Sequence, residues 1–345
     1  MSCFDGYSYL MQKPKLSVLD QSVAVVGRTE DASIRQTLEL AQHAEALGYH
    51  RFWVSEHHNH PSIVGSAPEV LMAAIAATTR RIRIGSAGVM LPHYAPLKVA
   101  EQFRVLEALA PGRIDLGVGR APGSDMRTAR LLRQSPPQSS DDFPIQVREL
   151  QAWVCGIDLP DGHPGHGVSA NPLGPTSPTL WMLGSSDYGA QLAAHFGLPY
   201  AFAHFITDGQ GAGQALDLYR QLYRPSALHP KPKAVLCVWA LAAETELDAW
   251  HQFSSRERWK LDRNKGATGP LPSPQEAALQ PYSTAEQAQV KLMRANALVG
   301  SSVQVAAKLQ ALAQLHAVDE LVVITWTHDV AAQRRSYELL AEQFM

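Results

Sequence analysis

Three histidines within four positions are the first residues whose spacing could do chemistry, and they close the stretch GYHRFWVSEHHNH at residues 48–60. Imidazole titrates near ~6.5, so His57 and His58 can give or take a proton at working pH. We therefore take these two as the candidate catalytic pair. A buried structural histidine is the alternative for either one, and His60 is expected to be an ordinary loop residue.

The same histidines raise the question of a metal ion. Successive strand residues point to opposite faces, so His57 and His58 cannot share one ion while the strand persists, although Glu56 and His58 could. No cysteine partner, no His-x-His at the first strand and no His-Glu-x-x-His helix accompanies them. We expect no metal centre, and a metal hydrolase is a distant alternative.

A second candidate is Arg120 in LGVGRAPG, where neighbouring glycines leave room for a ligand beside a fixed positive charge. The planar guanidinium suits a phosphate, and a surface ion pair is the alternative. The glycines follow G-x-G-x-x-x-G with Pro122 inside the motif, which is a weak dinucleotide-binding fingerprint. A second glycine-rich stretch, DGQGAGQAL at 208–216, is explained as well by a flexible loop that enters a helix.

The turn Gly184–Ser186 in WMLGSSDYGAQ is a third candidate because it joins a strand to a helix. Backbone N–H groups, the hydroxyls of Ser185 and Ser186 and the helix dipole would suit an anion the size of a phosphate. Simple N-capping of the helix by either serine is the alternative.

Small side chains at Ser86, Ala87 and Gly88 mark a fourth candidate, in the stretch IRIGSAGVM. A gap at these positions would let a flat ring lie against the backbone. A glycine bulge without a function is the alternative.

These candidates follow apolar runs that have the composition of β-strands. Eight runs are expected, beginning near Leu16, Arg51, Ile82 and Arg113 and then covering residues 179–183, 199–205, 233–242 and 320–326. Helical patterns separate them, so the sheet is parallel, and eight such units fit an α/β fold of the (β/α)₈ TIM barrel type. A doubly wound sheet is the competing architecture. In a barrel, the candidate residues meet at one mouth.

The helices between the first strands carry end signals. Ser33 and Gln36 are expected to form a capping box for the first helix, and Gly48 to end it. Ser66 and Glu69 are expected to form a capping box for the second.

A third helix is expected over residues 96–109. Two Pro-, Gly- and Ser-rich stretches, 121–178 and about 250–300, are the expected insertions, after the fourth strand and between the seventh and eighth. Both are candidates for lid-like segments. No compositional shift marks a boundary, so residues 1–345 are expected to form a single domain.

Composition restricts the partners. Lys and Arg number 30 against 32 Asp and Glu, so no basic excess indicates a nucleic-acid partner. No apolar run approaches the ~18 residues that span a bilayer, and the first residues lack a signal-peptide core. Cys3, Cys155 and Cys237, odd in number and without metal-like spacing, fit a reducing compartment. We expect a soluble, cytoplasmic protein without a membrane partner.

Taken together, four stretches resemble the bacterial luciferase-like flavin monooxygenases, and most closely the alkanal-monooxygenase-like subgroup. They are FWVSEHHN, IGSAGVMLPHYAPLKVAEQFRVLEALAPGRIDLGVGRAPGSD, WMLGSSDYGAQLAAHFGLPYAFAHF and DELVVITWTHDVAAQRRSYELLAE. The resemblance covers the chain from about Leu16 to Leu340. That family is a (β/α)₈ barrel, which agrees with the strand count.

The resemblance implies that reduced FMN binds and reacts with molecular oxygen to oxygenate a small-molecule substrate. It places His57 and His58 beside the flavin and the substrate, and a cis peptide that packs against the flavin ring at Ala87–Gly88. It assigns the flavin phosphate to Arg120 and to the turn Gly184–Ser186. Because no convincing nicotinamide fingerprint is present, we expect a separate flavin reductase to supply reduced FMN. A homodimer is expected by analogy.

Two departures limit the resemblance. Gly119 stands where the luciferase catalytic subunit has a reactive cysteine, and Gly184 where it has a glutamate. Light emission from a long-chain aldehyde is therefore not implied. A deazaflavin-dependent oxidoreductase that transfers hydride without oxygen, and a flavin-binding protein without turnover, are the remaining alternatives.

Overall fold

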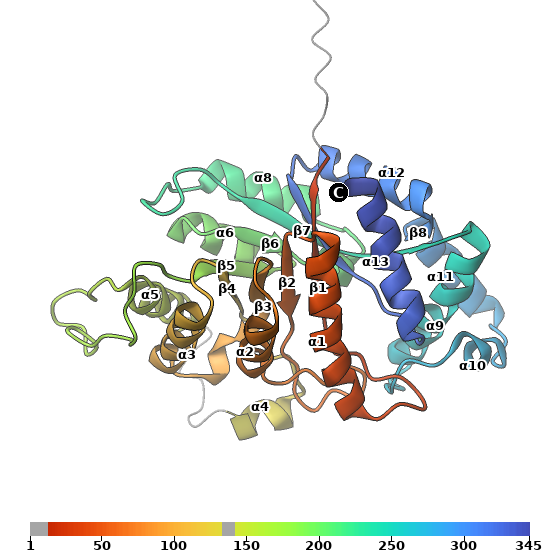
Figure 1. The fold of residues 1–345 in the computed structure, drawn as a ribbon, viewed down its shortest axis with the longest axis horizontal. Helices are drawn as coiled ribbons and strands as arrows, with labels where there is room; N and C mark the ends of the chain where they lie inside the picture. Colours follow the sequence, from red (N-terminus) through yellow and green to blue (C-terminus); the bar gives the residue numbers. More distant parts are fainter. Residues whose placement is uncertain (1–12, 133–141) are drawn as a thin grey trace, which may run out of the picture.

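Parallel β-strands form the centre of the computed structural model, which describes residues 13–132 and 142–345. The strands are β1 (Lys15–Asp20), β2 (Arg51–Val54), β3 (Arg83–Met90), β4 (Ile114–Gly119), β5 (Thr179–Gly184), β6 (Tyr200–Phe202), β7 (Ala234–Ala243), β8 (Leu298–Ser301) and β9 (Glu320–Ile324). Eight of them pair in the cyclic order β1-β2-β3-β4-β5-β6-β7-β9, and β9 pairs with β1 to close the sheet. The expected (β/α)₈ TIM barrel is confirmed (Figure 1).

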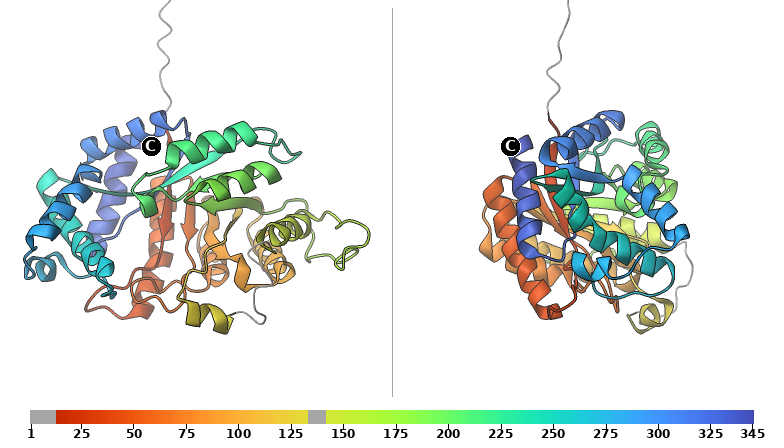
Figure 2. Two further views of the ribbon diagram at one scale, coloured as in Figure 1. Left: turned by 180° about the vertical axis from the view of Figure 1, so that it is seen from behind. Right: turned by 90° about the vertical axis from the view of Figure 1, so that its right-hand side faces the viewer.

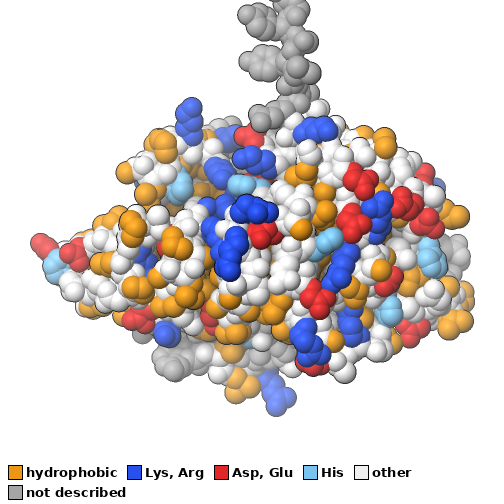
Figure 3. Space-filling view, viewed as in Figure 1, with side chains coloured by type: hydrophobic (Ala, Val, Ile, Leu, Met, Phe, Trp, Pro, Cys, Tyr) orange, Lys and Arg blue, Asp and Glu red, His pale blue; other side chains and the backbone are white. Residues whose placement is uncertain are grey.

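Helices surround the strands, as the two views of Figure 2 show. They are α1 (Glu30–Leu47), α2 (Pro68–Thr78), α3 (Pro96–Leu109), α4 (Met126–Leu132), α5 (Asp142–Cys155), α6 (Asp187–Phe196), α7 (His204–Thr207), α8 (Ala212–Leu222), α9 (Glu246–Asn264), α10 (Pro274–Ala278), α11 (Thr284–Ala295), α12 (Ser302–Leu315) and α13 (Val330–Phe344). Within the two described ranges, none combines the length and apolarity that a membrane span needs. On the face in view in Figure 3, cationic and acidic side chains are interspersed.

Side chains alternate along the strands between two cores. Leu16 and Val18 of β1 belong to the buried cluster between the sheet and the outer helices, whereas Leu19 belongs to the cluster inside the barrel. Phe52 and Trp53 of β2 divide in the same way. Successive residues of a strand point to opposite faces, so a strand that is buried on both sides must be apolar throughout. This is why the strands appear in the sequence as continuous apolar runs.

The first helix ends as expected and begins differently. Gly48 follows α1 in the left-handed conformation with a φ of 89°, which a glycine adopts without steric cost. The expected capping box of Ser33 and Gln36 is wrong, because α1 already begins at Glu30. Ser33 lies inside the helix, where its hydroxyl donates to the Val23 carbonyl at 2.8 Å. The serine thus ties the helix to the loop after β1.

The capping box expected for the second helix is also wrong. α2 begins at Pro68, with Ala67 at the N-cap position and no side-chain cap. Ser66 therefore lies one residue before the N-cap position. Pro68 fits the first position of the helix, because a backbone N–H there would have no acceptor within the helix. The third helix has the expected bounds.

Both insertions contain more regular structure than their composition indicates. The segment after β4 contains α4 and α5; residues 133–141 of it lie outside the described residues. The segment between β7 and β9 contains α9 to α12 and β8, a strand that the sequence did not predict. β8 pairs with the second half of β7, from Ala240↔Leu298 to Ala243↔Ser301. A four-residue run is too short to show a strand period.

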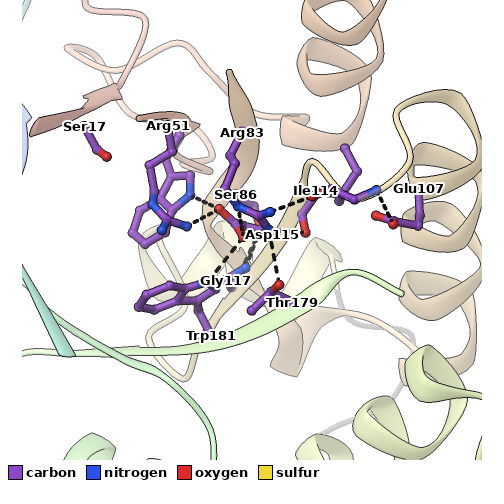
Figure 4. Close-up of polar contacts among 12 residues, drawn as sticks. Ser17, Arg51, Arg83, Ser86, Glu107, Ile114, Asp115, Gly117, Thr179 and Trp181 are labelled. Atoms are coloured by element: carbon purple, nitrogen blue, oxygen red, sulfur yellow. Dashed lines mark hydrogen bonds and ion pairs between the residues drawn. The ribbon is translucent and has the colours of Figure 1, made fainter. Parts of the chain in front are cut away.

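A buried charged cluster fills the N-terminal end of the barrel (Figure 4). Asp115 of β4 pairs with Arg51 and with Arg83, each at 2.6 Å, and accepts from the Trp181 indole at 3.4 Å. Arg51 also pairs with Glu320 at 2.5 Å. Burial by itself would raise the pKa of Asp115, but Arg51 and Arg83 outweigh it and hold that pKa below its ordinary value. This end of the barrel is therefore packed by paired charges.

Candidate active site

A cavity of about 510 Å³ opens at the C-terminal ends of the barrel strands. Its wall brings together seven of the predicted site residues: His57, Ala87, Gly88, Arg120, Gly184, Ser185 and Ser186. These residues lie near the C-terminal ends of β2, β3, β4 and β5 or just after them, so fragments distant in the chain converge at one mouth, as active sites of this fold do. His58, the remaining predicted residue, is not part of this wall.

One end of the cavity has the groups that an anion needs. The Arg120 guanidinium carbon lies 4.1 Å from the ring centroid of Tyr188, in the first turn of α6. Ser186 occupies the N-cap position of α6, but its side chain makes no cap hydrogen bond, so simple N-capping does not use the hydroxyl. Among the described residues, no carboxylate forms an ion pair with Arg120. The arginine and the helix N-terminus face the same space.

The first turn of α6 also contains an acidic side chain. Asp187 accepts a hydrogen bond from Gln214 Nε2 at 2.6 Å. A carboxylate at a helix N-terminus offsets part of the attraction that the helix dipole exerts on an anion. The charge of Arg120 is therefore the dominant favourable contribution at this end of the cavity.

The end of β3 contributes two small residues, Ala87 and Gly88, to the cavity wall. The peptide Ala87–Gly88 is cis, as expected, and the pairing register with β4 shifts between Ala87 and Val89. A Cβ atom on Gly88 would meet the Leu183 side chain and would lie 2.7 Å from the Gly117 carbonyl oxygen. No side chain larger than hydrogen fits at Gly88, because Leu183 and the Gly117 backbone already occupy the space.

His57 lies on the cavity wall with a perturbed pKa. Its backbone N–H donates to the Gly65 carbonyl at 2.9 Å, and its Nδ1 lies 3.4 Å from Ser55 Oγ. Burial lowers its pKa to about 4, and the neighbouring imidazoles of His60 and His58 act in the same direction. The ring is therefore neutral at pH 7, whereas the sequence expectation used the ordinary value near ~6.5.

His58 points into a separate hydrogen-bond network behind the wall. Its Nε2 lies 2.7 Å from Glu56 Oε1, and the buried Glu56 also accepts from the Tyr94 hydroxyl at 2.7 Å and from the Met90 N–H at 3.0 Å. The backbone N–H of His58 donates to the Gly123 carbonyl at 3.0 Å. His58 thus connects the loop after β4 to the end of β3.

Comparison with known proteins identifies a family for this chain. The sequence profile described as luciferase-like monooxygenase matches residues 15–319. The chain belongs to this family. It is 41% identical to a luciferase-like monooxygenase of Escherichia coli (strain K12) over 328 residues, covering 94% of this chain and 95% of that protein. It is 36% identical to the N-acetyl-S-alkylcysteine monooxygenase of Bacillus subtilis (strain 168), covering 95% and 97%.

Solved structures agree with the fold of this luciferase-like monooxygenase. The crystal structure of apo-MsnO8 matches with a TM-score of 0.86 and 37% identity, covering 96% of this chain and 98% of that one. The oxygenating constituent of 3,6-diketocamphane monooxygenase from Pseudomonas putida, in complex with FMN, matches with a TM-score of 0.70 and 18% identity, covering 96% and 97%. An F420-dependent secondary alcohol dehydrogenase matches with a TM-score of 0.67 and 15% identity, covering 97% and 100%.

The sequence reasoning missed one wall of this luciferase-like monooxygenase. Arg256, Trp259, Lys260 and Arg263 of α9 all line the cavity. Their spacing of i, i+3, i+4 and i+7 is that of one helix face, and this was the signal that could have identified them. It was overlooked because α9 begins an insertion that composition marked only as a loop-rich stretch.

His60 also lies on the wall, although it was expected to be an ordinary loop residue. Its Nδ1 accepts from the backbone N–H groups of Ser62 and Ile63, each at 3.1 Å. Burial lowers its pKa, and the charge of Arg263 acts in the same direction. Across the described ranges, no group of three His, Cys, Asp or Glu side chains could hold a metal ion.

Proposed function

We propose that this luciferase-like monooxygenase uses FMN, which a separate reductase delivers in reduced form, and oxygenates a small organic substrate. One observation carries the proposal. Arg120, Ser185 and Ser186 converge on the same cavity as the peptide Ala87–Gly88, whose two residues are small. An anion site at a helix N-terminus and a wall of small residues across the same opening match the two ends of a phosphorylated planar ring.

Each part of the cavity has a role in this proposal. Arg120, with Ser185, Ser186 and the first N–H groups of α6, would hold the phosphate. The isoalloxazine ring would lie against Ala87–Gly88. Reduced FMN supplies the two electrons with which one oxygen atom of O₂ enters the substrate while the other leaves as water.

His57 is the proposed catalytic residue that faces the flavin and the substrate. Because its pKa lies at about 4, the ring is neutral at pH 7 and can accept a proton or a hydrogen bond in the cavity. His58 is proposed as a positioning residue, since it touches Glu56 and the backbone of Gly123 and does not line the cavity. Both histidines lie in the loop after β2, and only His57 lines the cavity.

Apolar side chains exclude water from the proposed reaction space. Met90, Leu183 and Phe205 line the cavity together with Trp239 and Trp326. A dry environment strengthens the electrostatic contacts to a bound ligand and protects reactive species from hydrolysis. The names of the relatives favour this chemistry, since the similar Bacillus subtilis protein is a monooxygenase and the Pseudomonas putida structure contains FMN.

Titration with FMN and with the deazaflavin F420 tests the proposal. We expect the protein to quench FMN fluorescence at saturation and to change the rate at which reduced FMN is reoxidised by O₂ in stopped-flow measurements. Binding of F420 without binding of FMN would instead support hydride transfer without oxygen. Binding of FMN with reoxidation at the rate of free flavin would support a flavin carrier without turnover.

A further inference from the structure

Three cations of α9 line the cavity on one helix face. Arg256, Lys260 and Arg263 stand at positions i, i+4 and i+7, and all three contribute to the cavity wall. The guanidinium of Arg256 lies 4.3 Å from the Trp239 ring centroid, and that of Arg263 lies 5.1 Å from the Trp259 ring centroid. Stacking on indole rings fixes both guanidinium groups without occupying their N–H donors.

These three cations have fewer ion pairs than Arg258, the other arginine of the same helix. On the face directed away from the cavity, Arg258 pairs with Asp262 at 2.5 Å and with Glu286 at 2.8 Å. On the cavity face, Lys260 pairs with Asp208 at 2.7 Å, and neither arginine has an ion pair with a described residue. A positive excess therefore remains on the wall.

The physical environment makes this excess costly without a partner. Burial lowers the pKa of Arg256 to about 10, Arg263 adds to the effect and Asp208 opposes it. Burial also lowers the pKa of Lys260, again with repulsion from Arg256. Like charges held together in a partly dry wall repel each other unless an anion joins them.

The wall also has an excess of hydrogen-bond donors. Trp239 and Trp326 line the cavity, and the indole N–H of each is buried without an acceptor among the described residues. A buried donor that has no partner costs free energy, and a small side-chain adjustment toward an oxygen-bearing ligand would satisfy it.

The α9 wall stands opposite the proposed flavin position. β7, which leads into α9, is four strands from β3 in either direction around the closed sheet. Figure 1 shows α3, which follows β3, and α9 on opposite sides of the barrel. A ring that lies against Ala87–Gly88 therefore turns its other face toward Arg256 and Trp239. The phosphate site at Arg120 is a separate part of the wall, between β4 and α6.

From this arrangement we infer that the substrate is a small organic carboxylate, held between the flavin and α9 with its carboxylate on Arg256, Lys260 and Arg263. The inference rests on the proposed monooxygenase function and specifies its substrate class. Arginine forks bind carboxylates in bidentate geometry, and the tryptophan rings of the same wall suit an apolar remainder. Asp208, by pairing with Lys260, lowers the affinity for anions, and it lowers the affinity for dianions more than that for monoanions.

Binding measurements test the inference without any turnover. A panel of carboxylates from acetate to 4-phenylbutyrate, each paired with its primary amide, is titrated by calorimetry into the protein saturated with FMN. We expect at least one carboxylate to bind roughly tenfold tighter than its amide, because only the carboxylate makes a charge-assisted contact with the arginines. A tenfold difference in affinity corresponds to about 1.4 kcal/mol. Arg256→Gln and Arg263→Gln should each abolish most of that difference and leave amide binding unchanged.

Two further variants complete the test, one as a matched control and one as a gain of affinity. Lys265→Gln removes a cation from the end of α9 that does not line the cavity, so it should leave carboxylate affinity unchanged. Asp208→Asn should raise carboxylate affinity about threefold, because it frees Lys260 from its pair. Asparagine tolerates the φ of 50° at this position.

Three results would overturn the inference. The first is equal affinity for every carboxylate and its amide. The second is that no carboxylate depends on Arg256 or Arg263 for binding. The third is a loss of FMN or F420 affinity in Arg256→Gln, which would assign these cations to the cofactor. Failure of FMN binding in the unmodified protein would contradict the proposed function itself, and is measured separately.

Discussion

The guanidinium of Arg120 stacks on the ring of Tyr188, 4.1 Å from its centroid, and so joins the loop after β4 to the first turn of α6. Stacking holds the arginine side chain in place while its N–H donors stay free. The contact explains how an exposed arginine can form part of a defined site. It also places the positive charge where the helix N-terminus already favours an anion.

Arg120→Ala should weaken FMN binding about ten- to a hundredfold, because a hydrogen bond to a charged group contributes about 1.5–3 kcal/mol. Quenching of flavin fluorescence measures the dissociation constant. The matched control is Arg127→Ala, which removes an exposed arginine of α4 that does not line the cavity. Equal losses in the two variants would show that general charge, and not this contact, holds the phosphate.

Gly88→Ala should destabilise the protein by about 1–3 kcal/mol, because the added methyl group meets the Leu183 side chain and the Gly117 carbonyl. It should also weaken FMN binding by displacing this part of the cavity wall. At Gly119 an added Cβ has nothing within 4 Å, so Gly119→Ala should leave stability unchanged. Thermal unfolding of both variants, with and without FMN, makes the comparison, and similar melting temperatures would refute the steric argument.

The barrel could be predicted because strands buried on both faces leave apolar runs that no other element produces at this spacing. The candidate site followed, since the ends of those strands must meet. The starts of α1 and α2 could not be predicted from the capping-box pattern; Ser33, for example, lies inside α1 and bonds Val23, a partner from another segment. The sequence could not show that His58 turns away from the cavity, because the orientation of its side chain depends on a hydrogen bond to the buried Glu56.

The α9 wall shows a different limit. The spacing of Arg256, Lys260 and Arg263 was visible in the sequence, but nothing local distinguishes a helix face that lines a cavity from one that faces solvent. The distinction comes from the way the insertion folds back over β7 and pairs β8 with it. The sequence of a single segment does not show where the segment will pack in the folded chain.

His57 should make the protein less stable in acid. Its pKa is about 4 when folded and near ~6.5 when unfolded, so the unfolded chain binds the proton first. The stabilising contribution is complete above about pH 6.5 and is lost as the pH falls toward 4; the loss reaches about 2 kcal/mol at pH 5 and about 3 kcal/mol below pH 4. Urea unfolding at pH 7.5 and pH 5 should show a smaller difference for His57→Gln than for the unmodified protein. An unchanged difference would mean that the imidazole is hydrated.

Glu56→Leu should cost about 2–4 kcal/mol, because it leaves the Tyr94 hydroxyl and the Met90 N–H without their shared acceptor. Glu101→Ala is the control, since Glu101 has an exposed contact of 3.9 Å with Lys98 and no other polar contact within residues 13–132 and 142–345. Chemical denaturation measures both. If Glu56 also positions the end of β3, its variant should lose FMN affinity in the folded fraction, whereas the control should not.

Asp115→Asn should destabilise the protein by about 3–5 kcal/mol, because a buried carboxylate that serves two arginines loses its charge, which leaves Arg83 without an ion pair among the described residues and Arg51 with Glu320 alone. Asp31→Asn breaks an exposed pair with Arg35 and should cost less than about 1 kcal/mol. Because Asp115 fills the end of the barrel opposite the cavity, FMN affinity measured at a temperature where the variant is folded should stay unchanged. A variant that keeps full stability but loses FMN would mean that this cluster positions the mouth, not the base, of the barrel.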